Sequence, residues 1–155
     1  MTQELLSEIQ QKRPFKSLEQ EAFLNIVRTA SVLQDSFDKV LKPAGITSAQ
    51  YNVLRILRGA EPEGLCRNEV RDRMLTRMPD MTRLLDRMET AGLVSRTRDS
   101  EDRRVVTTRV SNKGARLLEK LDGAVAREHE RRLSHLTKTQ LETLIALLSA
   151  VRRGG

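Results

Sequence analysis

The 155-residue sequence has no tryptophan, one tyrosine, three phenylalanines and a single cysteine, Cys66. One cysteine excludes a framework of disulfides within the chain, and so few rings mean a core built mainly from Leu, Val, Ile and Met. No run approaches the roughly 18 apolar residues of a membrane span. The polar start, MTQELLSEIQQKRPF, lacks the apolar segment of a secretory signal. We therefore expect a cytoplasmic protein of one domain with helical extensions, and no membrane partner.

The signatures of common enzymes are also missing. The sequence contains no Gly-rich phosphate loop, no GxSxG and no HExxH. Its two histidines, His129 and His135, have no cysteine nearby. Glu128, His129 and Glu130 could chelate a metal, but on a solvated helix such a run is more often surface charge. We expect no catalytic residue, no metal ion and no cofactor.

Positive charge is abundant and unevenly distributed. The chain has 28 Lys and Arg against 21 Asp and Glu, a net charge of +7. Between Lys42 and Lys113 there are thirteen arginines and no lysine. Arginine offers a rigid fork of donors that suits phosphate oxygens and guanine edges. The pattern indicates a nucleic acid partner, although genomic base composition can produce the same bias.

Spacing of apolar residues predicts the order of elements. Pro43 and Gly45 end a first long helix, and TSAQ (47–50) and TKTQ (137–140) are capping boxes that open later helices. Pro79 is expected at a first helical position, with Asp80 in the first turn. The predicted order is helices over residues 17–41, 47–58, 66–74 and 79–91, strands over 93–97 and 105–110, and helices opening at residues 111 and 137.

Residues 46–111 therefore read as three helices followed by a two-stranded ribbon. This is a mainly α fold with a small β-ribbon, a winged helix-turn-helix that would bind DNA. The helix over residues 79–91 would lie in a major groove, with its apolar stripe inward and Thr82, Arg83 and Arg87 outward. The alternative is an ordinary amphipathic surface helix.

The flanking regions, residues 1–45 and 112–155, are expected to form a helical dimerisation region. Their amphipathic helices have more apolar surface than the central domain can cover, and a second copy of the chain would cover the rest. Burial within one chain is the alternative, and it would leave apolar stripes exposed. The residues expected at the dimer interface are Leu18, Leu133, Leu141, Leu144 and Leu148.

Residues 82–114, TRLLDRMETAGLVSRTRDSEDRRVVTTRVSNKG, resemble the recognition helix and wing of the MarR (multiple antibiotic resistance regulator) family. Members typically carry TRLxxRLExxGLVxRxxxxxDRRxxxxxLTxxG. The departures are Met88 in place of Leu, Val110-Ser111 in place of Leu-Thr, and Pro79-Asp80-Met81 in place of small polar residues. A composite of linked motifs is a specific signal, and the flanking helices extend the resemblance over nearly the whole chain.

The resemblance implies a homodimeric transcriptional regulator that binds a pseudo-palindromic double-stranded operator, most often a repressor. It also implies a small anionic or aromatic effector, bound between the dimerisation helices and the DNA-binding lobe. In the wing, Arg103 would enter the minor groove, and Asp102 beside it would hold the Arg103 guanidinium in pose, while Arg104 would meet a phosphate. A solvated charged turn is the alternative. The implied DNA-binding residues are Pro79, Asp80, Thr82, Arg83, Arg87, Asp102, Arg103 and Arg104.

Two other functions fit parts of the sequence. Cys66 stands at a helix start, where the helix dipole favours a reactive thiolate, so the regulator could sense oxidants. A lone cysteine at such a junction is more often inert packing. A winged helix can also serve protein–protein or RNA binding, but the arginines of the wing favour DNA.

Overall fold

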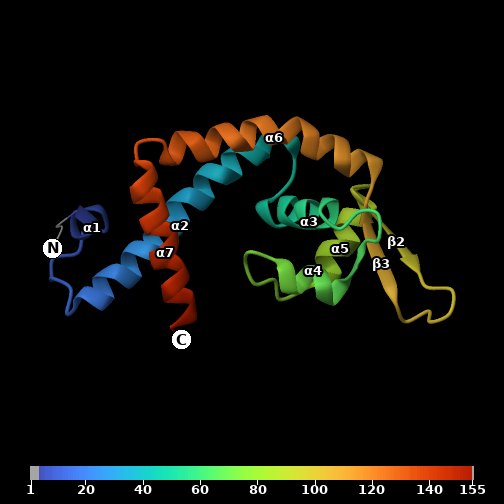
Figure 1. The fold of residues 1–155 in the computed structure, drawn as a ribbon, viewed down its shortest axis with the longest axis horizontal. Helices are drawn as coiled ribbons and strands as arrows, with labels where there is room; N and C mark the ends of the chain where they lie inside the picture. Colours follow the sequence, from blue (N-terminus) through green and yellow to red (C-terminus); the bar gives the residue numbers. More distant parts are fainter. Residues whose placement is uncertain (1–3, 155) are drawn as a thin grey trace. The chain divides into compact units, whose positions relative to one another are not determined.

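The computed structural model describes residues 4–154, which divide into two compact units, residues 4–37 and 38–154. Helices dominate, and the expected mainly α fold with a small sheet is confirmed (Figure 1). The elements are α1 (Glu4–Glu8), α2 (Leu18–Leu41), the 3-10 helix η1 (Lys42–Ala44), α3 (Ser48–Arg58), β1 (Leu65–Cys66), α4 (Arg67–Arg73), α5 (Met81–Thr90), β2 (Val94–Arg98), β3 (Val106–Val110), α6 (Asn112–Leu133) and α7 (Lys138–Arg153). None of the helices within residues 4–154 has the length and apolar character needed to cross a membrane.

The first unit contains α1 and most of α2. Arg28 of α2 pairs with Glu8 of α1 at 3.4 Å. Several apolar side chains of α2 are exposed, among them Phe23 at 65% and Val27 at 52%. One turn of helix separates these two residues, so they form an apolar stripe on the surface of α2.

Helix starts follow the expected capping chemistry, with one correction. Thr47 and Thr137 both form the predicted capping boxes, each with a glutamine three residues later. The prediction for Pro79 was wrong, because α5 begins at Met81 and Asp80 is its N-cap. The Asp80 carboxylate accepts a hydrogen bond from the Arg83 amide at 2.9 Å. An aspartate that caps the helix satisfies an amide donor there, and Pro79 lies outside the helix.

The ribbon is part of a three-stranded antiparallel sheet in the order β1-β3-β2. Strand β1 is only two residues long, and no local pattern predicted it. Its Leu65 pairs with Thr108, which lies opposite Arg96 on the other side. Just before β1, Gly64 has φ of 74°, and a Cβ there would lie 2.7 Å from the Thr108 carbonyl oxygen. Glycine thus permits the close approach that adds the third strand.

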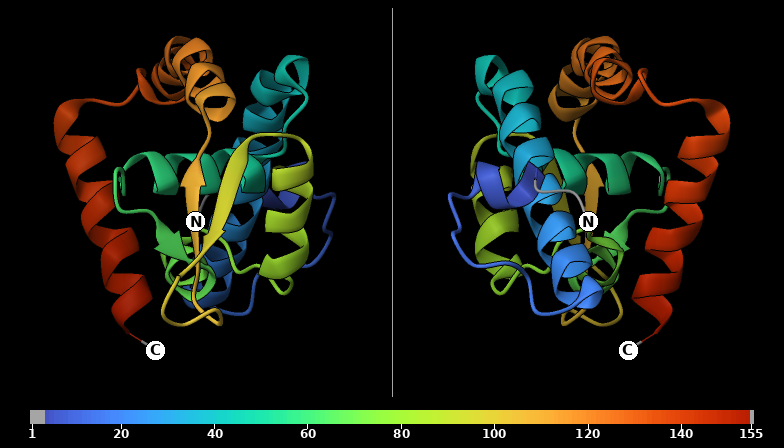
Figure 2. Two further views of the ribbon diagram at one scale, coloured as in Figure 1. Left: turned by 90° about the vertical axis from the view of Figure 1, so that its right-hand side faces the viewer. Right: turned by 90° about the vertical axis from the view of Figure 1, so that its left-hand side faces the viewer.

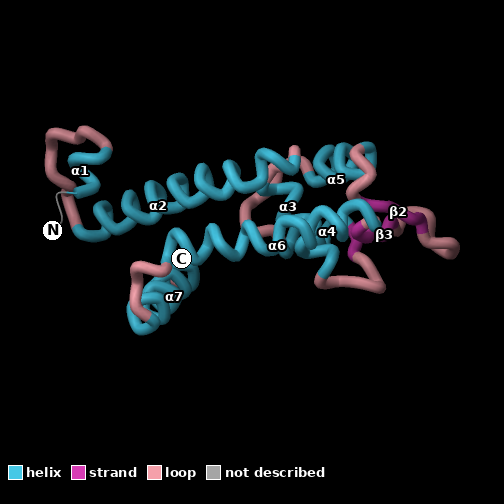
Figure 3. The backbone as a smooth tube through the Cα atoms, turned by 90° about the horizontal axis from the view of Figure 1, so that it is seen from above, coloured by secondary structure: helices cyan, strands magenta, loops and turns pink. Residues whose placement is uncertain are grey.

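The hydrophobic core of the second unit joins α3, α4, α5 and α6. Completely buried residues include Leu54 of α3, Val70 of α4, Met88 of α5 and Leu118 of α6. Helices α3, α4 and α5 lie beside the sheet (Figure 2), and the loop between β2 and β3 extends beyond them (Figures 1 and 3). This is the arrangement of a helix-turn-helix with a wing.

The first turn of α6 is bonded to the residues that end α5. The Ser111 hydroxyl donates to the Gly92 carbonyl at 2.6 Å, and the Lys113 ammonium donates to the Ala91 carbonyl at 2.8 Å. A Cβ at Gly114 would collide with the Leu93 carbonyl oxygen. The helix after the wing is therefore held closely against the end of α5.

Candidate nucleic-acid interface

Helix α5 has three faces with different chemistry. Its buried face anchors the helix to the core. The other two faces are exposed stripes, each with the i, i+4, i+7 spacing that aligns side chains along a helix. The buried residues are Met81, Leu85 and Met88, the first exposed stripe is Thr82, Asp86 and Glu89, and the second is Arg83, Arg87 and Thr90.

The first exposed stripe, called the acidic stripe below, contacts neighbouring elements. The Arg67 guanidinium at the start of α4 donates to the Thr82 hydroxyl at 2.9 Å. Arg96, at the centre of β2, donates to Asp86 at 2.6 Å and to Glu89 at 2.9 Å. Sequence reasoning did not single out Arg67. It placed Arg96 only within the family motif, because its two acidic partners lie on another element.

The second exposed stripe has two arginines whose side chains can bind a ligand. Arg83 is 69% exposed and pairs only loosely, at 3.4 Å, with Asp80, whose other oxygen caps the helix. Arg87 lies one turn further along and is also exposed. Two guanidinium groups on one exposed face can bind phosphate oxygens or guanine edges. Asp80 acts chiefly within its own helix.

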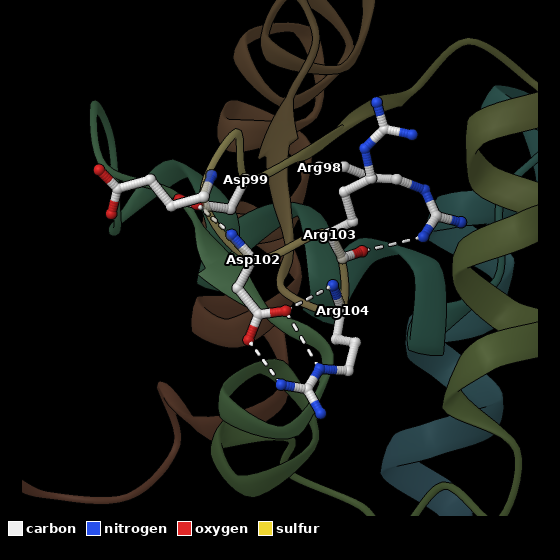
Figure 4. Close-up of polar contacts among 6 residues, drawn as sticks. Arg98, Asp99, Asp102, Arg103 and Arg104 are labelled. Atoms are coloured by element: carbon white, nitrogen blue, oxygen red, sulfur yellow. Dashed lines mark hydrogen bonds and ion pairs between the residues drawn. The ribbon is translucent and has the colours of Figure 1, made fainter.

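The loop that joins β2 to β3 is ordered by its own hydrogen bonds. Asp99 accepts from the amides of Glu101 at 2.7 Å and Asp102 at 3.0 Å. These amide bonds, that of Asp102 first, lower the pKa of Asp99, because they stabilise its carboxylate form. Arg98 of β2 donates to the Arg103 carbonyl at 3.0 Å (Figure 4). Hydrogen bonds within the loop therefore hold its tip in one conformation.

At this tip Asp102 holds Arg104. Its Oδ1 accepts from the Arg104 amide at 3.0 Å and from Nε at 3.1 Å, and its Oδ2 accepts from Nη2 at 3.4 Å (Figure 4). The side-chain bond from Arg104, followed by the amide bond, lowers the pKa of Asp102. Within residues 4–154, the Asp102 carboxylate accepts hydrogen bonds from Arg104 and none from the Arg103 guanidinium. Sequence reasoning had paired the acid with Arg103.

A groove of about 460 Å³ lies between the start of α4, α5 and the wing. Three guanidinium-bearing residues, Arg67, Arg96 and Arg104, line it. Half-buried Cys66 also lines it, and its backbone amide donates to Glu69 at 2.8 Å. The remaining lining residues are Asn68, Thr82, Leu85, Val105, Val106 and Thr108.

The residues expected at a dimer interface belong to α2, α6 and α7. Leu18, at the start of α2 in the first unit, is 67% exposed. Leu133 ends α6, and it is half-buried. The others lie on α7, which has no buried residue: Leu141 and Leu148 are half-buried and Leu144 is 38% exposed.

Comparison with known proteins decides the family. A profile of the MarR family matches residues 44–105, from the end of η1 into the wing. The crystal structure of a MarR transcription factor from Planctomyces limnophilus is 39% identical, with a TM-score of 0.68, and the match covers 88% of this chain and 99% of that one. The chain belongs to the MarR family.

Two further relatives of this MarR family protein are regulators. The HTH-type transcriptional regulator FarR of Neisseria gonorrhoeae is 27% identical over 117 residues, 76% of this chain and 79% of FarR. The transcriptional repressor CouR, solved on a 23-mer DNA duplex, is 26% identical with a TM-score of 0.75, and the match covers 99% of each chain. This MarR family protein is accordingly a DNA-binding transcriptional regulator.

Proposed function

We propose that this regulator is a cytoplasmic, homodimeric repressor, which binds a pseudo-palindromic operator and leaves it when a small anionic or aromatic effector binds. In each subunit α5 occupies a major groove and the wing occupies the adjacent minor groove. The observation that carries the DNA contacts is the ordered wing, in which Asp102 holds the exposed Arg104 at 3.1 Å. An exposed arginine already held in position suits a narrow groove of negative potential.

The proposal assigns different roles to the arginines. On α5, Arg83 and Arg87 contact base edges and phosphates, and Thr82 borders them. In the wing, Arg104 enters the minor groove and Arg103 meets a phosphate, the reverse of the roles expected from the sequence. The Asp102–Arg104 pair supports this exchange. Pro79 and Asp80 serve DNA binding by setting where α5 begins.

Dimerisation is proposed through residues 1–45 and 112–155, with residues 46–111 as the DNA-binding domain. Helix α7 supports this, because Ile145, Leu147 and Val151 are each more than 60% exposed in the single chain. Leu141, Leu144 and Leu148 lie on the same helix, and Leu18 and Leu133 add to the apolar surface. A second copy would cover these side chains. Two recognition helices would then meet half-sites about one DNA turn apart, and the 23-mer bound by CouR is long enough for such a pair.

Release by an effector is proposed at the groove of about 460 Å³ between α4, α5 and the wing, and not between the dimerisation helices and the DNA-binding lobe, as the family resemblance implies. Arg67 and Arg104 would attract an anionic group there, whereas the Arg96 guanidinium is already paired with Asp86 and Glu89. An occupied groove would disturb Arg104 and so weaken the minor-groove contact. The repressor CouR supports this class of mechanism, since it has been solved both on DNA and with p-coumaroyl-CoA.

A footprint on the DNA flanking the gene for this protein tests the proposal. We expect protection of two half-sites about one DNA turn apart, with an imperfect two-fold repeat. The protected sequence, as a labelled duplex, should bind at least ~1,000-fold more tightly than a scrambled duplex at the same salt concentration. Equal affinity for both duplexes would contradict the proposal.

A further inference from the structure

Two carboxylates stand on the helix proposed to enter the major groove. Asp86 and Glu89 belong to α5, and Asp86 directly precedes Arg87. Carboxylates this close to DNA phosphates would repel them unless a cation neutralised the acids. The arginines of the recognition helix itself do not offset these negative charges, because they lie on the other exposed stripe.

Arg96 on β2 pairs with both acids through one nitrogen atom and offsets one of their two negative charges. Its Nη2 is 2.6 Å from Asp86 Oδ1 and 2.9 Å from Glu89 Oε1. The Arg96 side chain is only 22% exposed, whereas those of Asp86 and Glu89 are 55% and 42% exposed. A partly buried arginine between two acids has little freedom to swing toward a phosphate.

The strand that contains Arg96 is held in place by its pairing with the middle strand of the sheet. Arg96 is the central residue of β2 and pairs with Thr108 of β3, the middle strand of the sheet. Thr108 is 1% exposed. Strands β2 and β3 continue directly into the wing tip, so a tie between Arg96 and α5 joins the recognition helix to the wing.

The ionisation of these groups favours a charged cluster. The Arg96 side-chain hydrogen bond, then its charge and its backbone amide, lower the pKa of Glu89 against the effect of desolvation. The hydrogen bond of the Arg96 guanidinium to Glu89, followed by its bond to Asp86, raises the pKa of Arg96. Arg96 and Glu89 therefore each stabilise the charged form of the other.

We propose that Arg96 is a positioning residue for operator binding. It ties Asp86 and Glu89 of α5 to β2, which keeps the recognition helix and the wing at one spacing. Its single positive charge also offsets one of the two negative charges that would otherwise repel DNA. This inference rests on the proposed placement of α5 and the wing on DNA. Arg96 itself contacts no phosphate.

A double-mutant cycle separates this role from a direct phosphate contact. The four proteins are the parent, Arg96→Ala, Asp86→Asn with Glu89→Gln, and the triple variant. In the parent background, Arg96→Ala should weaken operator binding about tenfold, because two freed carboxylates face DNA and the tie to the wing is lost. In the background without the two charges, the same change should weaken operator binding less than about threefold, because the carboxylates with which Arg96 pairs are then absent.

Salt dependence and a matched variant complete the test. Arg96→Ala should leave the salt slope on operator DNA unchanged, whereas loss of a phosphate contact would lower it by about one. Arg96→Lys should restore part of the affinity. Arg116→Ala, on the exposed surface of α6, removes the same charge and should change binding less than about threefold. Melting temperatures of all the variants show whether each one folds. If Arg96→Ala does not fold, the acid variants and Arg96→Lys still test the role of Arg96.

The outcomes are distinct. Equal cost of Arg96→Ala in both backgrounds, with a salt slope lower by about one, would mean that Arg96 binds phosphate, and the inference would be overturned. No effect on operator affinity would overturn it as well, while the proposed function would stand. A parent protein without preference for operator over scrambled DNA would overturn the proposed function and the inference together.

Discussion

Replacement of the two adjacent wing arginines, one at a time, tests which of them enters the minor groove. The Arg104 side chain is 92% exposed, and Asp102 is the partner that restricts its rotamers in the free protein. Arg104→Ala should therefore remove a groove contact that is prepared before binding. A lost specific groove contact costs about 1–3 kcal/mol, or roughly 5- to 150-fold in operator affinity. The loss should be smaller at sites with G·C-rich flanks, where the minor groove is wider.

Arg103→Ala should behave as loss of one phosphate contact. Operator and scrambled duplexes should weaken alike, and the salt slope should fall by about one unit on both. Asp102→Ala has two opposing effects, because it removes a negative charge near DNA and frees the Arg104 guanidinium. We expect the second effect to win on the operator, with about three- to tenfold weaker binding, while scrambled DNA binds slightly better.

Anisotropy titrations of labelled operator and scrambled duplexes at several salt concentrations measure these changes. The Asp102 effect on operator should vanish in the Arg104→Ala background, because no guanidinium remains to be oriented. If Arg103→Ala costs more operator affinity than Arg104→Ala, the roles assigned from the Asp102–Arg104 pair are wrong. Small, equal effects of both changes on both duplexes would make the wing a solvated turn.

Three further predictions concern assembly, acid stability and the cysteine. Sedimentation at micromolar concentration should give about twice the 17.6 kDa of one chain, and Leu144→Asp with Leu148→Asp should split the dimer by placing charge on an apolar surface; a monomeric parent would contradict the architecture. The Arg58 side-chain bonds lower the pKa of Asp122 from its ordinary 3.8, so this pair stabilises the fold above that pH and its contribution is lost as the pH falls toward the lowered value. Urea unfolding of the parent and Asp122→Asn should thus differ at pH 7 and converge at acid pH, and a constant difference would contradict the linkage. Cys66→Ser should bind operator nearly as well as the parent with or without peroxide; a peroxide response seen only in the parent would make Cys66 a redox sensor.

The elements that sequence reasoning recovered depend on local signals. The capping boxes at Thr47 and Thr137 need only side chains and amides three residues apart, so a short stretch of sequence contains both partners. The helix-helix-strand order followed from apolar spacing in the same way. The start of α5 was misplaced because proline at a first helical position and aspartate at the N-cap are both favourable, and Pro79-Asp80 offered both readings.

Contacts between distant residues were beyond that reasoning. Strand β1 forms because Leu65 and Cys66 lie against β3, more than forty positions later in the chain. Arg96 meets Asp86 and Glu89 only after β2 has folded beside α5. Even within the wing, adjacent arginines are equivalent in sequence, and the path of the loop decides that Asp102 meets Arg104.

These contacts also explain how an exposed helix can keep one orientation. At the start of α5, Arg67 of α4 donates to Thr82. Further along, Arg96 of β2 binds the acidic stripe. At its end, Lys113 of α6 donates to the Ala91 carbonyl and so caps the helix. Three different elements thus hold the polar surface of α5 while its buried residues hold the apolar one. Because the second exposed stripe is not used in this attachment, Arg83 and Arg87 remain available for a ligand outside the chain.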